Sequence, residues 1–254
     1  MKVTVEKHTP VTTVVISRPE CRNAVDHETA ELLKAAFEEF EADAAQVVAV
    51  LCGAGEHFCA GYDLKTVGHA QAPYDPDGSG PLGPTRMLLS KPVVCAVEGY
   101  AVAGGLELTL WSDIRIASET AIFGVFCRRW GVPLIDGGTV RLARLIGHSR
   151  ALDMILSGRP VDAREALSFG LANRVVPAGQ ARTAAEQYAA EIARFPQVCM
   201  RTDRMSSYRQ WSMSIEDALR YEAREGLRPL REEARAGAQR FATGKGRGGT
   251  FSDI

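Results

Sequence analysis

The stretch 98–118, which reads EGYAVAGGLELTLWSDIRIAS, constrains this chain more than any other. The apolar run at 92–97 before it is typical of a strand buried on both faces. A glycine-containing turn follows, and the pattern then predicts a helix that opens at Gly104 and Gly105 with Glu107 in its first turn. The N-terminus of a helix stabilises negative charge, and a carboxylate beside it can transfer protons. This combination favours an enzyme that stabilises an oxyanion over a passive binding module.

Size and charge narrow the class of protein. The chain has 254 residues, of which 46% are hydrophobic, which is enough for one large domain or a domain with an appendage. A net charge of -1 does not favour nucleic acid or an anionic membrane, so local charges must hold any anionic ligand. Charges interrupt every apolar run well before the roughly 18 residues of a membrane span. We therefore expect a cytoplasmic protein with neither a nucleic acid nor a membrane as partner.

Cysteine and histidine spacing argues against a disulfide framework and a metal site. None of the six cysteines forms a CxxC pair, and the five histidines show neither HxxxH nor HExxH spacing. We expect free thiols in a reducing compartment and no bound metal. Gly244, Gly246 and Gly249 spell GxGxxG, but no strand is predicted before them and no helix after, so we expect no dinucleotide cofactor.

Hydrophobic periodicity predicts strands that alternate with helices through the first part of the chain. Strands are expected at 2–7, 11–17, 47–51, 93–97 and 113–117, with a helix from Asp26 to about Asp43. This alternation predicts an α/β core with parallel strand pairing. Four prolines and four glycines between residues 68 and 84 predict a surface loop, with a lid over a neighbouring site as the alternative.

The second half of the chain has a mostly helical pattern. The expected order is a single helix at 139–157, a helix between Asp162 and Gly170, a strand at 171–176 and a helix at 178–194. Two or three helices rich in Arg and Glu follow Pro196 and are interrupted by Pro229. We expect an α/β core at 1–195 and a C-terminal helical region at 196–254.

Two segments carry small residues directly after buried strands, where backbone amides can reach a ligand. They are 56–64, which follows the strand at 47–51, and 99–108, which follows the strand at 93–97. If these strands are neighbours, the two loops lie at the same sheet edge. One amide from each could then bind the same carbonyl oxygen, and one such donor is worth about 3 kcal/mol of transition-state stabilisation.

Four motifs together identify a known family. The first two are VVAVLCGAGEHFCAGYDLK and KPVVCAVEGYAVAGGLELTLWSDIRIAS. The others are ISRPECRNAVD near the N-terminus and SGRPVDAREALSFGLANRVVP later in the chain, before a tail that reads FATGKGRGGTFSDI. In this order, and over nearly the whole chain, they resemble the crotonase (enoyl-CoA hydratase/isomerase) superfamily.

The resemblance implies a ββα-repeat spiral core and a C-terminal α-helical region that trimerises, giving a homotrimer or a dimer of trimers. It implies an acyl-CoA thioester as substrate and no separate cofactor, because coenzyme A is part of the substrate. Matching the motifs places the two oxyanion-binding amides at Tyr62 and Gly104, beside Gly105. Glu107, one turn into the helix, then performs acid–base chemistry; the alternative is a carboxylate that interacts only with the helix dipole.

The same matching assigns residues that bind coenzyme A. Ala60, Asp63 and Leu64 fall where the family contacts adenine and pantetheine. Arg22 falls where a basic residue often contacts the phosphates, and an arginine suits phosphate recognition. An exposed arginine on a solvated turn is the alternative. Phe126 and Trp130 would make the acyl pocket aromatic, or they are ordinary core residues.

The chain departs from the family at its second catalytic acid. Alignment on Gly131 puts Cys127 at that position, and a thiol with a pKa of about 8.5 cannot replace a carboxylic acid. Either Arg128 and Arg129 lower the pKa of Cys127, or Cys127 lines the substrate site without chemistry. Asp136 is the other acid that could approach the acyl pocket as a catalytic group; the alternative is a turn residue that caps the helix at 139.

We therefore expect an acyl-CoA enzyme, with hydration of a 2-enoyl-CoA as the predicted reaction. Isomerisation of the double bond by the single base Glu107 is the near alternative, because a single base can both remove and return a proton. A catalytically weak acyl-CoA binding protein is the alternative from another class, and the departure at Cys127 motivates it.

Overall fold

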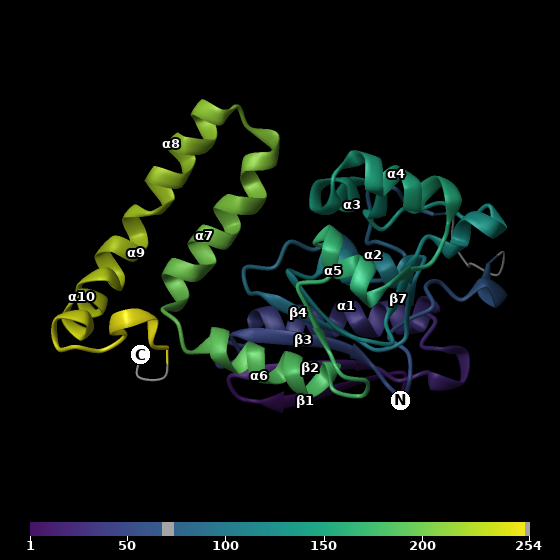
Figure 1. Cartoon of the computed structure of the whole chain (residues 1–254), viewed down its shortest axis with the longest axis horizontal. Helices are drawn as coiled ribbons and strands as arrows, with labels where there is room; N and C mark the ends of the chain where they lie inside the picture. Colours follow the sequence, from purple (N-terminus) through teal and green to yellow (C-terminus); the bar gives the residue numbers. More distant parts are fainter. Residues whose placement is uncertain (68–73, 252–254) are drawn as a thin grey trace. The chain divides into compact units, whose positions relative to one another are not determined.

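The computed structural model describes residues 1–67 and 74–251. The chain forms two compact units, Met1–Ala189 and Ala190–Ile254 (Figure 1). The first unit contains both β-sheets, and the second consists of helices. In the part of the chain that is described, no helix is both long and apolar enough to cross a membrane.

A six-stranded sheet forms the centre of the first unit. In spatial order its strands are β1 (Val3–His8), β2 (Val11–Ile16), β3 (Val48–Gly53), β4 (Val93–Val97), β6 (Ile114–Ser118) and β9 (Arg174–Val176). β1 and β2 pair antiparallel, and every other neighbouring pair is parallel. Because β3 and β4 are direct neighbours, the loops that follow them start at the same sheet edge, which meets the condition on which the predicted oxyanion site depended.

The predicted turn before Gly104 contains a strand that the sequence did not indicate. β5 (Tyr100–Val102) pairs in parallel with β7 (Ile122–Gly124), which in turn pairs with β8 (Val161–Asp162). Cys59 forms an isolated parallel bridge to Ala101 on the other side of β5. The chain that approaches Tyr62 is therefore paired with the strand that leads to Gly104.

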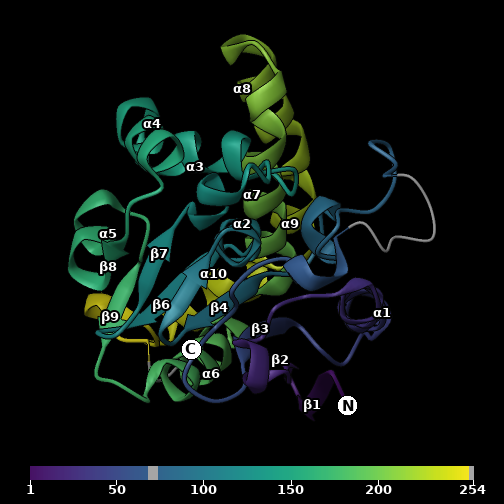
Figure 2. The same cartoon turned by 90° about the vertical axis from the view of Figure 1, so that its right-hand side faces the viewer.

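Helices cover both faces of the six-stranded sheet. α1 (His27–Ala42) begins as predicted, because Asp26 accepts a hydrogen bond from Thr29 N at 2.9 Å. Val14 belongs to the main apolar cluster with residues of α1 and α2 (Gly104–Trp111). On the opposite face of β2, Thr13 donates to Glu186 of α6 (Ala181–Ala193) at 2.9 Å. Figure 2 shows α2 and α6 on opposite sides of the sheet.

The predicted single helix at 139–157 is wrong. The structure has two helices there, α3 (Gly138–Ile146) and α4 (His148–Ser157). Gly147 separates them with φ of 82° and ψ of 153°, a conformation that glycine adopts without steric cost. α5 (Ala163–Phe169) has the predicted cap, since Asp162 accepts from Glu165 N at 2.8 Å.

The prediction of a surface loop between residues 68 and 84 is corrected in its second half. Residues 68–73 lie outside the described part of the chain. Residues 74–77 are exposed, but Leu82 is completely buried. Pro84 begins a 3₁₀ turn, Pro84–Arg86, in which Pro84 and Thr85 are buried. The segment 80–86 returns to the protein interior because Leu82 packs there, and it reaches the candidate site.

The second unit contains α7 (Gln197–Arg209), α8 (Ile215–Glu225), α9 (Leu227–Glu232) and α10 (Ala234–Ala242). Pro229 lies in the first turn of α9, where its missing N–H removes no intrahelical hydrogen bond. Several large apolar side chains in this unit are exposed, among them Ile215, Leu219, Leu227, Leu230 and Phe241.

Candidate active site

The two predicted oxyanion-binding segments lie in contact. A Cβ atom added to Gly61 would stand only 2.8 Å from Gly104 N, so the Gly61–Tyr62 peptide is adjacent to the Gly104 amide. Gly61 has φ of 96°, and both its conformation and this close approach require glycine. Segment 59–63 is held by Val25, which accepts from Asp63 N and donates to Gly61 O.

The Tyr62 and Gly104 amides are both available to a ligand. Within residues 1–67 and 74–251, neither amide donates a hydrogen bond to another residue. Gly104 is the first residue of α2, so its N–H has no partner inside the helix. Ala103, just before it, has φ of 54° and ψ of -124°, a conformation unfavourable for a residue with a side chain. Such strain is typical of functional sites.

Glu107 lies in a helix that is buried on every side, and its side chain is 2% exposed. Its Oε1 accepts hydrogen bonds from Asp136 N at 2.9 Å and from Gly138 N at 2.8 Å. Among the described residues its other oxygen, Oε2, makes no hydrogen bond. Glu107 therefore does more than interact with the dipole of its own helix: it also caps α3, and one oxygen is left for a substrate.

The surroundings of Glu107 favour its protonated form. Burial, and then the negative charge of Asp136, raise the pKa of Glu107 to about 7. The two amide hydrogen bonds and the charge of Arg141 oppose this shift without reversing it. A carboxyl group with this pKa can accept and donate a proton near neutral pH, as a general acid–base catalyst must.

Asp136 does not cap α3, which was one sequence interpretation. The N-cap position is Gly137, and the Asp136 carboxylate instead bonds to the segment 80–86. Its Oδ1 accepts from Leu82 N at 3.1 Å and from the Thr85 hydroxyl. Asp136 is 3% exposed, and burial raises its pKa. It touches Glu107 through its main-chain N–H.

Cys127 lies in the short 3₁₀ helix Phe126–Trp130 and is 5% exposed. The hypothesis that Arg128 and Arg129 lower its pKa is wrong. Burial, and then the negative charge of Glu107, raise the pKa of the Cys127 thiol above its ordinary value, and the attraction of Arg128 is too weak to compensate. The thiol stays protonated at neutral pH, and it lies close enough to Glu107 for their charges to interact.

The residues predicted to bind coenzyme A lie in or next to the segment 59–64, which contains Tyr62. Ala60 N donates to Arg22 O at 2.9 Å, so the Arg22 backbone lies beside Ala60. The Arg22 guanidinium lies 5.8 Å from the centre of the Tyr100 ring. Asp63 is held by Arg18 at 3.0 Å, while Leu64 is 44% exposed.

Phe126 and Trp130, the aromatic residues expected at the acyl pocket, differ in their surroundings. The Phe126 ring lies 6.3 Å from the Tyr100 ring and 4.8 Å from the Arg129 guanidinium. Trp130 is 65% exposed, so it is not an ordinary core residue in this chain. Gly105 packs directly on Cys59, because an added Cβ would stand 2.0 Å from Cys59 O.

Three residues that help to hold the site were not predicted from the sequence: Asn23, Leu82 and Thr85. Asn23 Nδ2 donates to Ala54 O at 2.9 Å and to His57 O at 2.7 Å, which fixes the loop between β3 and Tyr62. The NA pair in the N-terminal motif was the available signal. Leu82 and Thr85 lay in a segment whose prolines and glycines concealed their burial.

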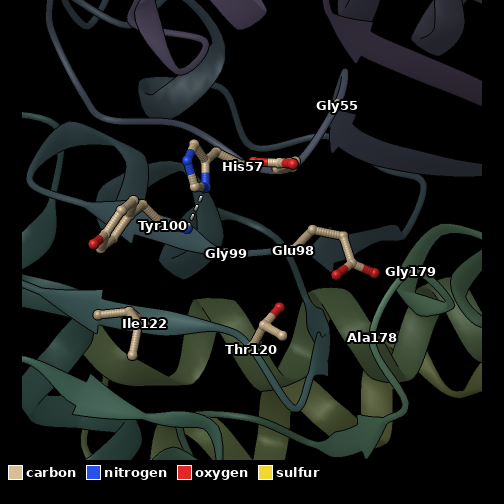
Figure 3. A pocket seen from close by; sticks show the side chains of 10 residues that line it. Gly55, His57, Glu98, Gly99, Tyr100, Thr120, Ile122, Ala178 and Gly179 are labelled. Carbon is tan, nitrogen blue, oxygen red and sulfur yellow. Dashed lines mark hydrogen bonds between the residues drawn. The ribbon is translucent and has the colours of Figure 1, made fainter.

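A cavity of about 490 Å³ lies at the start of β5 (Figure 3). His57, Glu98, Tyr100 and Thr120 are among its lining residues, and Tyr100 N donates to His57 Nδ1 at 3.4 Å. The cavity lining contains none of the three candidate groups described above, the two amides and the Glu107 carboxylate.

The chain is similar to known proteins over most of its length. The family model described as enoyl-CoA hydratase/isomerase matches residues 6–245. An enoyl-CoA hydratase from Mycobacterium tuberculosis is 34% identical over 246 residues, which cover 94% of this chain and 92% of the relative. A carnitinyl-CoA dehydratase from Proteus mirabilis is 38% identical over 183 residues, covering 71% of this chain and 70% of the relative.

A solved structure extends the likeness to the fold. The crystal structure of an enoyl-CoA hydratase from Mycobacterium marinum matches with a TM-score of 0.89 at 30% sequence identity. The match covers 95% of this chain and 96% of that chain.

Proposed function

The chain belongs to the enoyl-CoA hydratase/isomerase family, as its motifs predicted, and on that basis we propose that it hydrates the double bond of a 2-enoyl-CoA thioester. Its core has the predicted crotonase-type α/β fold. The observation that carries the proposal is the meeting of two unpaired amides, Tyr62 and Gly104, beside a buried glutamate whose pKa is about 7.

The two amides bind the thioester oxygen and stabilise the negative charge that develops on it. As this charge grows, the β-carbon becomes electrophilic and the α-carbon becomes basic. The dipole of α2 adds modest stabilisation because Gly104 is its first residue. These donors are fixed before the substrate arrives, so no reorganisation is needed during the reaction.

Glu107 moves the proton. As a carboxylate it takes a proton from water, and the hydroxide adds to the β-carbon of the substrate. The electron pair of the double bond moves to the thioester, which the amides hold as an enolate. Glu107, now protonated, returns the proton to the α-carbon, so that one water molecule is added and the carboxylate is regenerated.

Cys127 supports isomerisation as a second candidate reaction. The buried thiol, whose pKa is raised, cannot serve as the carboxylic acid found at this position in two-glutamate hydratases. A single glutamate can remove a proton from the α-carbon of a 3-enoyl-CoA and return it to the γ-carbon, which gives the 2-enoyl-CoA, or run the same transfer in reverse. This reaction needs no water, and the same two amides stabilise the enolate.

The remaining assignments follow from the family. On the family's pattern we assign Ala60, Asp63 and Leu64 to the adenine and pantetheine, and Arg22 to the phosphates of coenzyme A. Gly105, Phe126, Cys127 and Trp130 line the substrate site. The chain assembles as a homotrimer or a dimer of trimers in the cytoplasm, and the exposed apolar side chains of the second unit supply apolar surface for that assembly.

Turnover of crotonyl-CoA tests the proposal. Hydration removes the absorbance of the conjugated thioester, and product analysis separates it from isomerisation of a 3-enoyl-CoA. Glu107→Gln keeps an oxygen for the two amide hydrogen bonds but cannot carry the proton, so kcat should fall by about 10²–10⁴-fold.

Glu98→Gln is the matched control, because Glu98 also accepts a main-chain amide, Ala181 N at 2.9 Å, but lies in the separate cavity. Its turnover should resemble that of the wild type. Binding of crotonyl-CoA without turnover in the wild type would favour the weak binding protein. Conversion of 3-enoyl-CoA without hydration would favour the isomerase.

A further inference from the structure

We propose that Asp136 is a positioning residue whose carboxylate holds Leu82 against Gly104, and that Leu82 thereby selects acyl groups without a branch at the α-carbon. This inference rests on the proposed function. It assigns the Asp136 carboxylate to substrate selection, whereas the sequence alone left it as either a catalytic acid or a helix cap.

The segment 80–86 wraps around the Asp136 carboxylate. Oδ1 accepts from Leu82 N at 3.1 Å and from the Thr85 hydroxyl, and both groups are buried. Gly80 completes the wrapping, because an added Cβ there would stand 2.5 Å from Asp136 Oδ1. Gly83 N donates to Gly80 O at 2.8 Å, which closes the turn.

The Arg141 side chain also joins Asp136 to the segment 80–86, by donating to main-chain oxygens of both. Its Nη1 donates to Asp136 O at 2.9 Å and its Nη2 donates to Thr85 O at 2.6 Å. The other side of the segment rests on α1, since a Cβ added to Gly83 would stand 2.2 Å from Ala30 O. The segment is thus held between α1 and the turn that begins α3.

These contacts place the Leu82 side chain against Gly104, whose N–H is one of the two proposed oxyanion donors. A Cβ added to Gly104 would stand 2.6 Å from Leu82 Cδ1 and 3.2 Å from Cδ2, so the Leu82 methyl groups touch Gly104. Leu82 is completely buried. A thioester bound at Gly104 N has its α-carbon one bond from the carbonyl carbon. An α-methyl group would therefore compete with Leu82 for space.

Asp136 also connects the Leu82 side chain to the proposed catalytic acid, Glu107. Its N–H donates to Glu107 Oε1 at 2.9 Å, while its carboxylate holds Leu82. Asp136 thus fixes the position of Glu107 through its N–H and the position of Leu82 through its carboxylate. Its Oδ1 is already committed to two donors, which suits a positioning role.

The experiment compares three variants by their relative kcat/KM for crotonyl-CoA and tiglyl-CoA, its α-methyl analogue. Leu82→Ala should reduce the preference for crotonyl-CoA by about tenfold, a typical effect of one methyl-sized change in a pocket. Asp136→Ala releases Leu82 and should reduce the preference in the same way. Asp136→Asn keeps an acceptor oxygen for Leu82 N and Thr85 and should retain the wild-type preference.

Asp162→Ala is the matched control. It also removes a carboxylate that accepts a main-chain amide, but it lies at α5, so both substrates should be affected equally. Hydrogen exchange supplies a readout that needs no turnover. The amides of 80–86 should exchange faster in Asp136→Ala than in the wild type and Asp136→Asn.

The outcomes separate this inference from the proposed function. A wild type that hydrates neither substrate contradicts the proposed function, while the exchange measurement still tests the contact between Asp136 and the segment. If Asp136→Asn loses as much kcat as Asp136→Ala, Asp136 transfers protons and the inference is overturned. Unchanged exchange of 80–86 in Asp136→Ala, or an unchanged preference in Leu82→Ala, overturns it as well.

Discussion

Glu107 and Gly138 join the two helices of the candidate site: Oε1 of Glu107 in α2 accepts the N–H of Gly138, the first residue of α3, at 2.8 Å. The proposed catalytic carboxylate therefore also caps a second helix. A Cβ added to Gly138 would stand 2.9 Å from Glu107 Oε1, so this approach depends on glycine. The arrangement orients the carboxylate while burial keeps its pKa high.

Glu107→Gln should make the protein more stable at pH 8. Burial raises the pKa of Glu107 to about 7 from an ordinary value of 4.5. Below pH 4.5 the carboxyl is protonated in both the folded and unfolded states. Between pH 4.5 and 7 the unfolded state releases this proton while the folded state keeps it, so stability falls by about 3 kcal/mol across that window and stays level above it, in the wild type only. Urea unfolding at pH 4.5 and pH 8 measures this; an equal difference between wild type and variant at both pH values would contradict it.

The pH dependence of turnover should report the same group. If Glu107 acts as a base in the free enzyme, kcat/KM rises with pH through about 7. Asp136→Asn removes the negative charge that helps to raise the pKa of Glu107, so the rise should move to lower pH. A profile of kcat/KM from pH 5 to pH 9 for both proteins is the measurement. An unshifted profile would mean that Asp136 carries no charge in the active enzyme.

Gly104→Pro should abolish most turnover in a folded protein. Proline is tolerated at the first position of a helix but has no N–H, so the change removes one oxyanion donor; its Cβ, 2.6 Å from Leu82 Cδ1, also requires the Leu82 side chain to shift. Loss of one donor lowers kcat by at least about 10²-fold. Steady-state kinetics with crotonyl-CoA, together with a circular dichroism spectrum, tests this. Near-normal kcat would show that the Gly104 amide does not bind the thioester oxygen.

Ala103→Gly should stabilise the fold. Ala103 holds an unfavourable backbone conformation at φ 54° and ψ -124°, and such strain costs about 1–3 kcal/mol. Glycine relieves it but loses about 0.5–1 kcal/mol more conformational entropy on folding. The expected net gain in the free energy of unfolding is therefore about 1 kcal/mol. Chemical denaturation measures the free energy of unfolding. A loss of stability in the variant would mean that packing of the Ala103 methyl group stabilises the fold by more than the backbone strain destabilises it.

Cys127→Ser should leave kcat for crotonyl-CoA at the same order of magnitude. The raised pKa of the Cys127 thiol makes it a poor proton donor, and serine keeps the shape of the side chain while replacing the thiol with a hydroxyl. A general acid would instead lose about 10²-fold or more on replacement. Kinetics of this variant beside Glu107→Gln distinguishes the two roles for Cys127.

The sequence by itself determined the elements whose signals are local. The apolar run at 93–97 predicts β4, Asp26 predicts the start of α1, and the Gly104–Gly105 pair followed by Glu107 predicts α2 with its acid. Each of these signals depends on residues within a few positions of one another. The family motifs added the fold, because they are spread along nearly the whole chain in a fixed order.

Only the tertiary structure decided what depends on distant partners. β5 exists because β7 pairs with it, and a run of three residues gives no signal alone. The Asp136 carboxylate accepts a hydrogen bond from Leu82, which is 54 residues away in the sequence. No local pattern therefore distinguishes this role of Asp136 from that of a helix cap. Burial of Leu82 and the raised pKa of Glu107 likewise arise from packing by segments that are far apart in sequence. Desolvation and non-local hydrogen bonds, which require the assembled core, turned a predicted pattern into a site with a defined geometry.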